Sequence, residues 1–321
     1  MRAVAAVSIR YRCRSSSGGA RDVWADFASF RCCGYGLIID ISPQEFCVYA
    51  NPATAPSRTA VTVPQLHARK RAGEKIVMVT AYDASFAAAV DAAGIEVVLV
   101  GDSLGMVIQG ESSTLPVNLD HMVYHTAAVS RGLRNALLIA DLPFMSYATR
   151  EQAYASSARL IGEGRAAMVK LEGSGWATDV IHALSERDIP VCAHLGLTPQ
   201  SVHKLGGYRV QGRDDERAER LFDDAKAVAS AGADLLVLEC VPSALAQRIT
   251  AALAIPTIGI GAGPHCDGQV LVMYDLLGLT PGKRPRFSKN FLAGRDSIQS
   301  ALHAYADDVR SGAFPAPEHS Y

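Results

Sequence analysis

From about residue 61 onward, short apolar runs alternate with helix-forming stretches. The first run, residues 76–80, is continuous and rich in β-branched residues, as in a strand that is buried on both faces. The alanine-rich stretch after it, residues 84–93, begins at Asp83 and stops at Gly94, which predicts a helix. The same succession recurs along the chain. It predicts strands at residues 76–80, 97–100, 136–140, 167–171, 190–194, 235–238, 257–260 and 269–273, and helices at residues 84–93, 118–130, from 149 onward, 177–186, 215–230, 244–253 and 290–311.

Seven or eight consecutive strand–helix units predict an α/β fold with a parallel sheet. Two architectures satisfy this pattern, a closed (β/α)8 TIM barrel and an open doubly wound sheet. The dinucleotide-binding open sheet carries a G-x-G-x-x-G fingerprint, but here Pro264 stands where the last glycine would be. The phosphate loop G-x-x-x-x-G-K-[ST] does not occur either. We therefore expect the barrel, with residues 269–273 as an eighth strand after a cramped crossover.

Residues 1–60 differ in character from the rest of the chain. They hold four of the seven cysteines, a cluster of arginines and a Ser- and Gly-rich stretch at residues 15–19. An Arg- and Ser-rich start is typical of a transit peptide, but the acidic residues of this segment argue against one. We expect residues 1–60 to be a poorly ordered N-terminal extension without catalytic role, and residues 61–321 to form the catalytic barrel domain.

Composition narrows the class of protein. The 321 residues carry a formal net charge of −1, which argues against a nucleic-acid partner. With 49% hydrophobic and 20% charged residues the chain is globular, and no apolar run approaches the ~18 residues of a membrane span. The seven cysteines are odd in number and include no C-x-x-C pair, so neither a disulfide framework nor a zinc ribbon is expected. A reducing, cytoplasmic setting follows.

Charged residues collect at the predicted strand ends. In a parallel barrel the active site lies at the carboxyl ends of the strands. The residues that end or follow the strands are Asp83, Asp102, Asp141, Lys170, Glu172, His194 and Glu239. Carboxylates gathered at one rim would repel one another, and a hard divalent cation such as Mg²⁺ is the simplest remedy. Lys170 and Glu172 are two residues apart and therefore share a strand face, where the lysine can pair with an acidic substrate.

Each of these residues has a structural alternative. Asp83 fits a helix N-cap better than a metal ligand. Asp102, which has Gly101 and Gly105 around it, and Asp141, which precedes Leu-Pro rather than a helix, fit a functional role better than a cap.

Glu239 follows four apolar residues, 235–238. An apolar setting would raise the pKa of its carboxyl and suit it to proton transfer. For His194, a place in the core and a place in the site are equally compatible with the sequence.

Beyond these patterns, the chain resembles the ketopantoate hydroxymethyltransferase family from about residue 62 to about residue 320. The strings that carry the resemblance are TAYD (80–83), VGDSLGMVIQG (100–110), STLPV (113–117), YHTAAVSRG (124–132), ADLPFMSYAT (140–149), VKLEG (169–173), HLGLTPQSV (194–202), GGYRVQGR (206–213), LVLECVP (236–242), IGIGAG (258–263) and KNFL (289–292). Motifs of this length in this order are highly specific. The extension before residue 60 is a departure from the family.

The resemblance implies a (β/α)8 barrel of the phosphoenolpyruvate/pyruvate type that forms homo-oligomers, commonly decamers. It implies an enzyme of pantothenate (coenzyme A) biosynthesis that transfers a hydroxymethyl group from 5,10-methylenetetrahydrofolate to 3-methyl-2-oxobutanoate through a Mg²⁺-stabilised enolate. By resemblance, Asp102 and Asp141 bind Mg²⁺, and Glu172 binds it directly or through water. Asp102, Ser103, Asp141 and Lys170 bind the oxoacid, and Glu239 accepts the proton.

Two rival functions are compatible with the fold. A carbon–carbon or carbon–phosphorus lyase or mutase would use a similar barrel and similar Mg²⁺ ligands, but the lyase motif KKCGH does not occur here. A structural barrel without activity would have no reason to keep the whole charged set. The sequence does not indicate which residues bind the folate.

Overall fold

A computed structural model describes residues 10–14, 20–24, 60–280, 282 and 284–321. The chain falls into two compact units, Met1–Ser57 and Arg58–Tyr321. In the first unit, strand β1 (Arg10–Arg14) pairs in antiparallel fashion with β2 (Ala20–Trp24). The rest of the expected extension lies outside the described residues, and its poor order stays a prediction.

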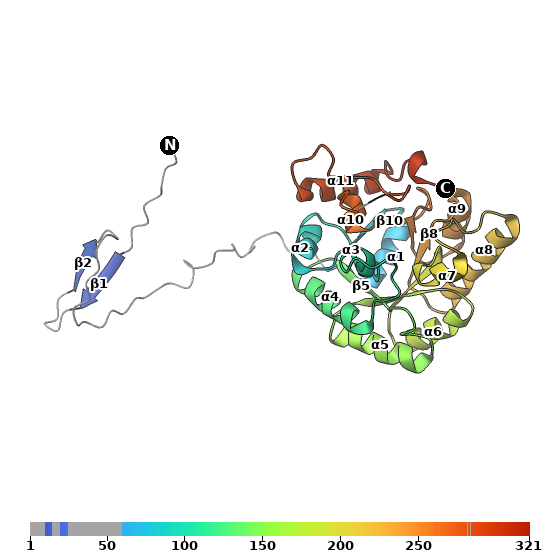
Figure 1. The fold of residues 1–321 in the computed structure, drawn as a ribbon, viewed down its shortest axis with the longest axis horizontal. Helices are drawn as coiled ribbons and strands as arrows, with labels where there is room; N and C mark the ends of the chain where they lie inside the picture. Colours follow the sequence, from blue (N-terminus) through green and yellow to red (C-terminus); the bar gives the residue numbers. More distant parts are fainter. Residues whose placement is uncertain (1–9, 15–19, 25–59, 281, 283) are drawn as a thin grey trace. The chain divides into compact units, whose positions relative to one another are not determined.

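The second unit is built on a closed barrel of eight strands, which confirms the predicted (β/α)8 fold (Figure 1). All neighbours are parallel, and the last strand closes the barrel against the first, with Val270 opposite Met78. The observed strands agree with the predicted ones to within two residues at each end. They are β3 (Ile76–Thr80), β4 (Val97–Val100), β5 (Leu137–Asp141), β6 (Met168–Glu172), β7 (Val191–Gly196), β8 (Leu235–Glu239), β9 (Thr257–Ile260) and β10 (Gly268–Leu271).

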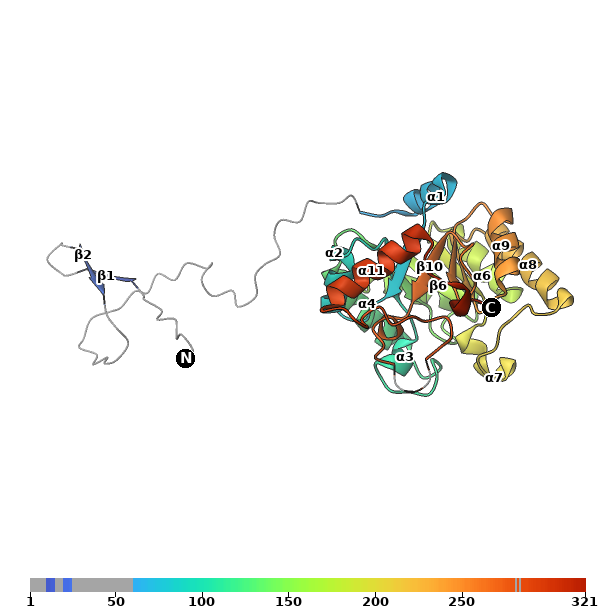
Figure 2. The same cartoon turned by 90° about the horizontal axis from the view of Figure 1, so that it is seen from above.

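Helices surround the barrel and also lie at both of its ends. The surrounding helices are α2 (Ala84–Ala92), α4 (Leu119–Gly132), α5 (Arg150–Gly162), α6 (Trp176–Ser185), α8 (Asp215–Ser230), α9 (Ser243–Ala252) and α11 (Ile298–Ser311). Shorter or terminal helices are α1 (Val63–Ala72), α3 (Leu104–Val107), α7 (Val202–Leu205) and α10 (Met273–Leu276). Figure 2 places α1 at one end of the barrel and α3 and α7 at the other. Among the helices of the described residues, none has the length and apolar character that a bilayer span requires.

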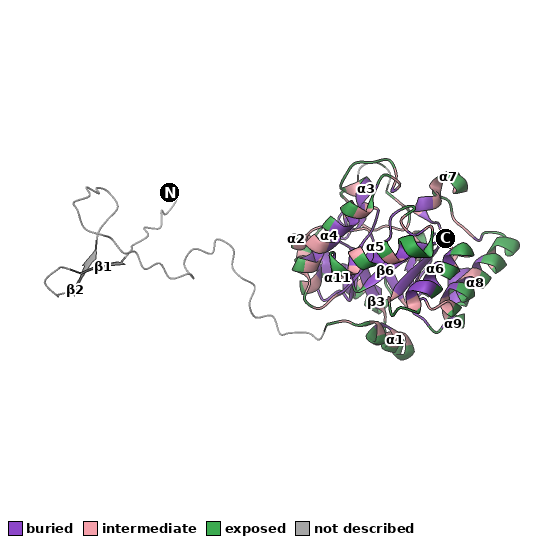
Figure 3. Ribbon diagram, turned by 90° about the horizontal axis from the view of Figure 1, so that it is seen from below, coloured by how far each residue is buried: buried purple, intermediate pink, exposed green. Residues whose placement is uncertain are grey.

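Alternate strand residues face two separate cores, as the period of a strand requires. Val77 and Val79 pack in a cluster with residues of the outer helices, whereas Ile76 and Met78 belong to a second cluster inside the barrel. Leu66 of α1, 1% exposed, joins the inner cluster and closes the N-terminal end of the barrel. Figure 3 shows the buried strands enclosed by helices with exposed outer faces.

The barrel closes between its last strand, β10, and its first strand, β3, and the chain around this seam differs from that around the other strand pairs. Residues 261–267 link β9 to β10 without a helix, which is the cramped crossover expected from the sequence. Helix α11 covers this seam, because the Tyr305 hydroxyl hydrogen-bonds to the carbonyl oxygens of Met78 (2.8 Å) and Gln269 (3.0 Å).

The last helix is shorter than the predicted 290–311. It begins only at Ile298, where the Ser297 hydroxyl caps it by accepting from the Ser300 amide (3.1 Å). Gly294 just before it has φ 73°, outside the helical region.

Asp83 is the N-cap of α2, as predicted. Its Oδ1 accepts hydrogen bonds from the amides of Ser85 (2.8 Å) and Phe86 (2.9 Å). We expect Asp83→Ala to lower the free energy of unfolding by about 0.5–2 kcal/mol, measured by urea denaturation. Asp83→Asn, which keeps an acceptor, should lose less. A stable Asp83→Ala protein that had lost most of its turnover would instead place this carboxylate in the active site.

Candidate active site

The charged residues predicted at the strand ends do converge at one end of the barrel. Asp141 ends β5, Lys170 and Glu172 lie on β6, His194 lies on β7, and Asp102 follows β4. All five are between 2% and 5% exposed. Burying so much charge is costly unless each group is paired, so the contacts among these side chains decide what the site can do.

Asp141 lies at the centre of the first group of contacts. Its Oδ1 accepts from the Lys170 ammonium (2.9 Å) and its Oδ2 accepts from the backbone amide of Asp102 (3.0 Å). Burial alone would lower the pKa of Lys170, but the attraction of Asp141 and Glu172 outweighs it and raises that pKa above its ordinary value. Burial and the repulsion of Asp141 and Glu172 raise the pKa of the Asp102 carboxyl. In this group the Lys170 ammonium is paired with Asp141, whereas the second carboxylate, that of Asp102, has no ion-pair partner among the described residues.

His194 forms the second group, between two glutamates. Its Nδ1 lies 3.4 Å from Glu172 Oε1, and its Nε2 lies 3.3 Å from Glu239 Oε2. Burial and the charge of Lys170 both act to lower the pKa of His194, yet the two glutamates outweigh them and raise it to about 9. Burial acts to raise the pKa of Glu172, but the contact with His194 outweighs it and lowers that pKa. His194 therefore belongs to the site, a question that the sequence left open.

Glu239 lies in less apolar surroundings than the sequence suggested. The strand that carries it is apolar, but its carboxylate faces the imidazole of His194, and its side chain is 15% exposed. In the parallel register Gly196 lies opposite Glu239, and its lack of a side chain makes room for the Glu239 carbonyl oxygen. Within the charged cluster, Glu239 has the most exposed side chain.

Gln200 connects the two groups, although no sequence pattern indicated a role for it. Its side-chain amide donates to Asp102 Oδ2 (2.8 Å) and to the Leu142 carbonyl (3.0 Å). Its backbone amide donates to Glu172 Oε2 (2.9 Å), and its Oε1 accepts from the Tyr147 hydroxyl (2.6 Å). Gln200 lies in a short 3₁₀ turn after β7, and only its place in the string HLGLTPQSV pointed to it.

Ser103 has a polar partner of its own. Its hydroxyl lies 2.9 Å from the hydroxyl of Tyr82, a residue that is 2% exposed. This contact fixes the serine next to Asp102, where a small polar ligand would meet both residues.

The donor set fits a magnesium ion that retains water or substrate ligands. Among the described residues, no three His, Cys, Asp or Glu side chains gather closely enough to enclose a metal by themselves. Mg²⁺ in proteins is commonly held by one or two carboxylates plus waters and substrate oxygens. Glu172 Oε1 is buried with only the imidazole of His194 near it, at 3.4 Å, so it is less firmly held than Oε2, which accepts from the Gln200 amide.

Comparison with known proteins finds relatives over the whole barrel unit. A family model described as ketopantoate hydroxymethyltransferase matches residues 60–317. The 3-methyl-2-oxobutanoate hydroxymethyltransferase 2 of Hahella chejuensis is 58% identical over 262 residues, covering 82% of this chain and 99% of the relative. The 3-methyl-2-oxobutanoate hydroxymethyltransferase of Methylococcus capsulatus is 60% identical over 261 residues, covering 81% of this chain and 97% of the relative.

Solved structures agree on the barrel type. The phosphoenolpyruvate phosphomutase of Streptomyces platensis has a TM-score of 0.52 at 14% identity, covering 67% of this chain and 82% of its own. A phosphonopyruvate hydrolase has a TM-score of 0.53 at 13% identity, covering 80% of this chain and 99% of its own. These similarities concern the fold alone, and they agree with the closed (β/α)8 barrel.

Replacing the Gln200 side chain should disturb the group around Asp102, while the bond from the Gln200 backbone amide to Glu172 is retained. We expect Gln200→Leu to lower turnover by about 10–100-fold, the usual effect of removing a group that orients metal or substrate ligands. Tyr147→Phe removes the partner of Gln200 Oε1 and the acceptor of the Glu172 backbone amide, but it keeps the bond from Gln200 to Asp102 and should cost less. Thermal unfolding would establish that both variants fold. Wild-type turnover in Gln200→Leu would show that the bridge has no role in the reaction.

Proposed function

The chain belongs to the ketopantoate hydroxymethyltransferase family, and from this premise we propose how the charged end of its barrel performs the reaction. The enzyme transfers a hydroxymethyl group to 3-methyl-2-oxobutanoate and gives 2-dehydropantoate, a step of pantothenate biosynthesis. The observation that carries the proposed mechanism is the position of Glu239, which touches a buried cation on one side and reaches the open end of the site on the other. Cytoplasmic location and assembly as a homo-oligomer stay predictions from the sequence.

Magnesium and a reduced folate are the proposed partners in the reaction. Asp102 and Asp141 would hold Mg²⁺, and Glu172 would hold it directly or through water. Burial and then the repulsion of Asp141 and Glu172 raise the pKa of Asp102, and a dication would relieve that repulsion, which supports this assignment. When bound, the metal would supply Lewis-acid stabilisation of the negative charge that develops on the oxoacid. The one-carbon donor would be 5,10-methylenetetrahydrofolate.

Lys170 and Ser103 would position the oxoacid. The ammonium of Lys170 supplies a fixed positive charge for the substrate carboxylate, and the Ser103 hydroxyl supplies a hydrogen bond. Because neighbouring carboxylates raise the pKa of Lys170, its nitrogen keeps its proton and has no lone pair with which to form a Schiff base. Lys170 therefore binds substrate rather than acting as a nucleophile.

Glu239 would remove the proton from C3 of the oxoacid. The imidazole of His194 lies 3.3 Å from its carboxylate and would hold that carboxylate in place for the proton transfer. Water would release the donor's methylene carbon at the oxidation level of formaldehyde and leave tetrahydrofolate. The carbon nucleophile would add to that carbon, and the oxygen, which comes from the water, would take up a proton to give the hydroxymethyl group. No covalent bond to the enzyme is needed at any stage.

The assignment of the metal ligands can be tested by calorimetry. We expect Asp102→Asn and Asp141→Asn to weaken Mg²⁺ binding and to abolish turnover, because each removes one negative charge from the donor set. Asp83→Ala, which changes an acidic residue outside the site, is the matched control and should bind Mg²⁺ normally. Wild-type Mg²⁺ affinity in both asparagine variants would contradict the assignment.

The proton transfer can be isolated by omitting the folate. In D₂O with Mg²⁺, the enzyme should exchange the C3 hydrogen of 3-methyl-2-oxobutanoate for deuterium, followed by proton NMR as loss of the methine signal. Chelating the metal should stop the exchange. Glu239→Gln should slow it by ~10²–10⁴-fold, the usual contribution of a positioned general base, with Mg²⁺ binding retained.

Two results would change the proposal. Equal exchange rates in the wild type and in Glu239→Gln would move the base elsewhere, with His194 as the first alternative. Exchange that required the folate would mean that donor binding completes the site before the proton is removed. A lyase or mutase site would have no reason to exchange this branched substrate.

A further inference from the structure

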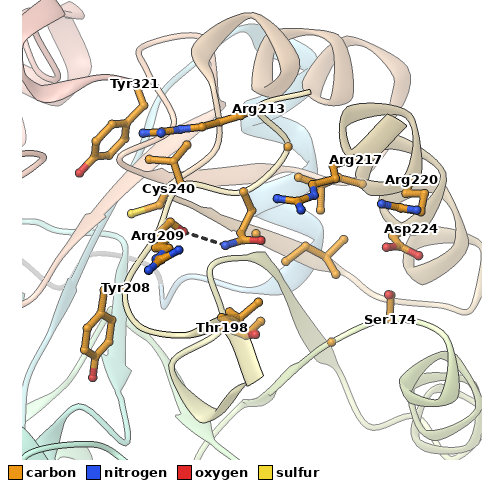
Figure 4. Close-up of a pocket in the computed structure, with 18 of the residues that line it drawn as sticks. Ser174, Thr198, Tyr208, Arg209, Arg213, Arg217, Arg220, Asp224, Cys240 and Tyr321 are labelled. Carbon is orange, nitrogen blue, oxygen red and sulfur yellow. Dashed lines mark hydrogen bonds between the residues drawn. The ribbon is translucent and has the colours of Figure 1, made fainter. Parts of the chain in front are cut away.

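A large cavity opens beside Glu239, and none of the steps above uses it. Its volume is about 1270 Å³, and its walls come from the ends of β7 and β8, the loop before α8 and the first turns of α8. Figure 4 shows the arginine side chains of this loop and helix around the cavity, with Tyr208 and Cys240 on the side toward the strand ends. Such a volume accommodates a ligand much larger than the oxoacid.

Backbone hydrogen bonds tie this cavity to the catalytic strand end. The Gln211 amide, in the middle of the loop, donates to the carbonyl of Cys240 (2.9 Å), and the Leu197 amide donates to the carbonyl of Glu239 (2.8 Å). Partial burial, followed by the negative charge of Glu239, raises the pKa of the Tyr208 hydroxyl. Tyr208 lines the cavity and is 51% exposed.

The charge of the cavity is strongly positive. Its lining includes five cationic side chains, Lys204, Arg209, Arg213, Arg217 and Arg220, against a single acidic one, Asp224.

Two of these cations already have partners. Arg217 lies 3.3 Å from Asp214, and Arg220 lies 2.7 Å from Glu216. Lys204, Arg209 and Arg213 have no ion-pair partner among the described residues. Positive charges gathered in a cleft without counter-charge attract an anionic ligand and favour its binding.

We propose that this cavity binds the glutamate moiety of the reduced-folate donor, with Arg209 and Arg213 pairing with its carboxylates. The inference rests on the proposed function, which requires a donor to approach Glu239 from outside the buried charge cluster. A folate carries two carboxylates at one end and its reactive ring at the other, separated by a benzoyl group. Guanidinium groups bind carboxylates in a bidentate geometry, and Tyr208 offers an aromatic ring in the same cavity wall.

The test compares two donors that differ only in the glutamate. Steady-state KM values would be measured with 5,10-methylenetetrahydrofolate and with 5,10-methylenetetrahydropteroate, which lacks the glutamate. The wild type should prefer the complete donor by about tenfold or more in KM, as expected for the loss of charged hydrogen bonds. In Arg209→Gln and Arg213→Gln this preference should shrink several-fold, and in the double variant it should disappear.

Lys226→Gln is the matched control, because it removes one positive charge from helix α8, which follows the loop of Arg209 and Arg213, at a position outside the cavity lining. It should keep the full preference for the complete donor. Equal use of both donors by the wild type would overturn the inference, and so would a preference that survives in the double variant. A wild-type enzyme that exchanged the C3 hydrogen of the oxoacid but used neither donor would instead refute the donor assignment of the proposed function.

Discussion

Compensation of buried charge at the carboxyl end of the barrel is the constraint on which the rest of the structure depends. Asp102, Asp141 and Glu172 are almost completely buried, and each carboxylate would lose much of its hydration energy there. Lys170 and His194 supply positive charge from within the same layer, at 2.9 Å from Asp141 and 3.4 Å from Glu172. Asp102 is left with the neutral amide of Gln200. The negative charge that remains is the charge that the proposed Mg²⁺ would offset.

The barrel brings these residues together through its parallel register. Inward-facing residues alternate along each strand, so Met168 in the apolar inner cluster predicts that Lys170 and Glu172 also point inward. The register of the parallel strand pairs then places Asp141 opposite Lys170, and Glu172 opposite His194. The lower layers of the same interior are apolar and rigid. A precise arrangement of charges at the end of the barrel therefore follows from pairings in the hydrophobic part below it.

This dependence explains what could be predicted from the sequence. The strands are continuous apolar runs, and the charged residues stand at their ends, so their shared location follows from topology alone. Gln200 could not be found in this way, because it reaches the site from a turn that folds over the strand ends. The arginines from 209 to 220 have the ordinary appearance of a solvated loop and helix in the sequence. Their common cavity depends on how that loop folds against β8. The start of α11 at Ile298 was also not predicted, because the expected helix 290–311 ignored the capping residue Ser297.

The backbone around Glu239 separates the two halves of the proposed reaction. Cys240, just after the base, has φ 49°, a strained value for a residue with a side chain. Gly196, which lies opposite Glu239 on β7, has φ 93°, and a Cβ at this position would collide with the carbonyl oxygen of Glu239. The carboxylate of Glu239 lies 3.3 Å from His194, while Cys240, the next residue, already lines the cationic cavity. In the proposed mechanism, proton removal takes place on the buried side, beside the paired charges. Attack on the donor carbon belongs to the open side, where a large anionic molecule can enter without crossing the carboxylates.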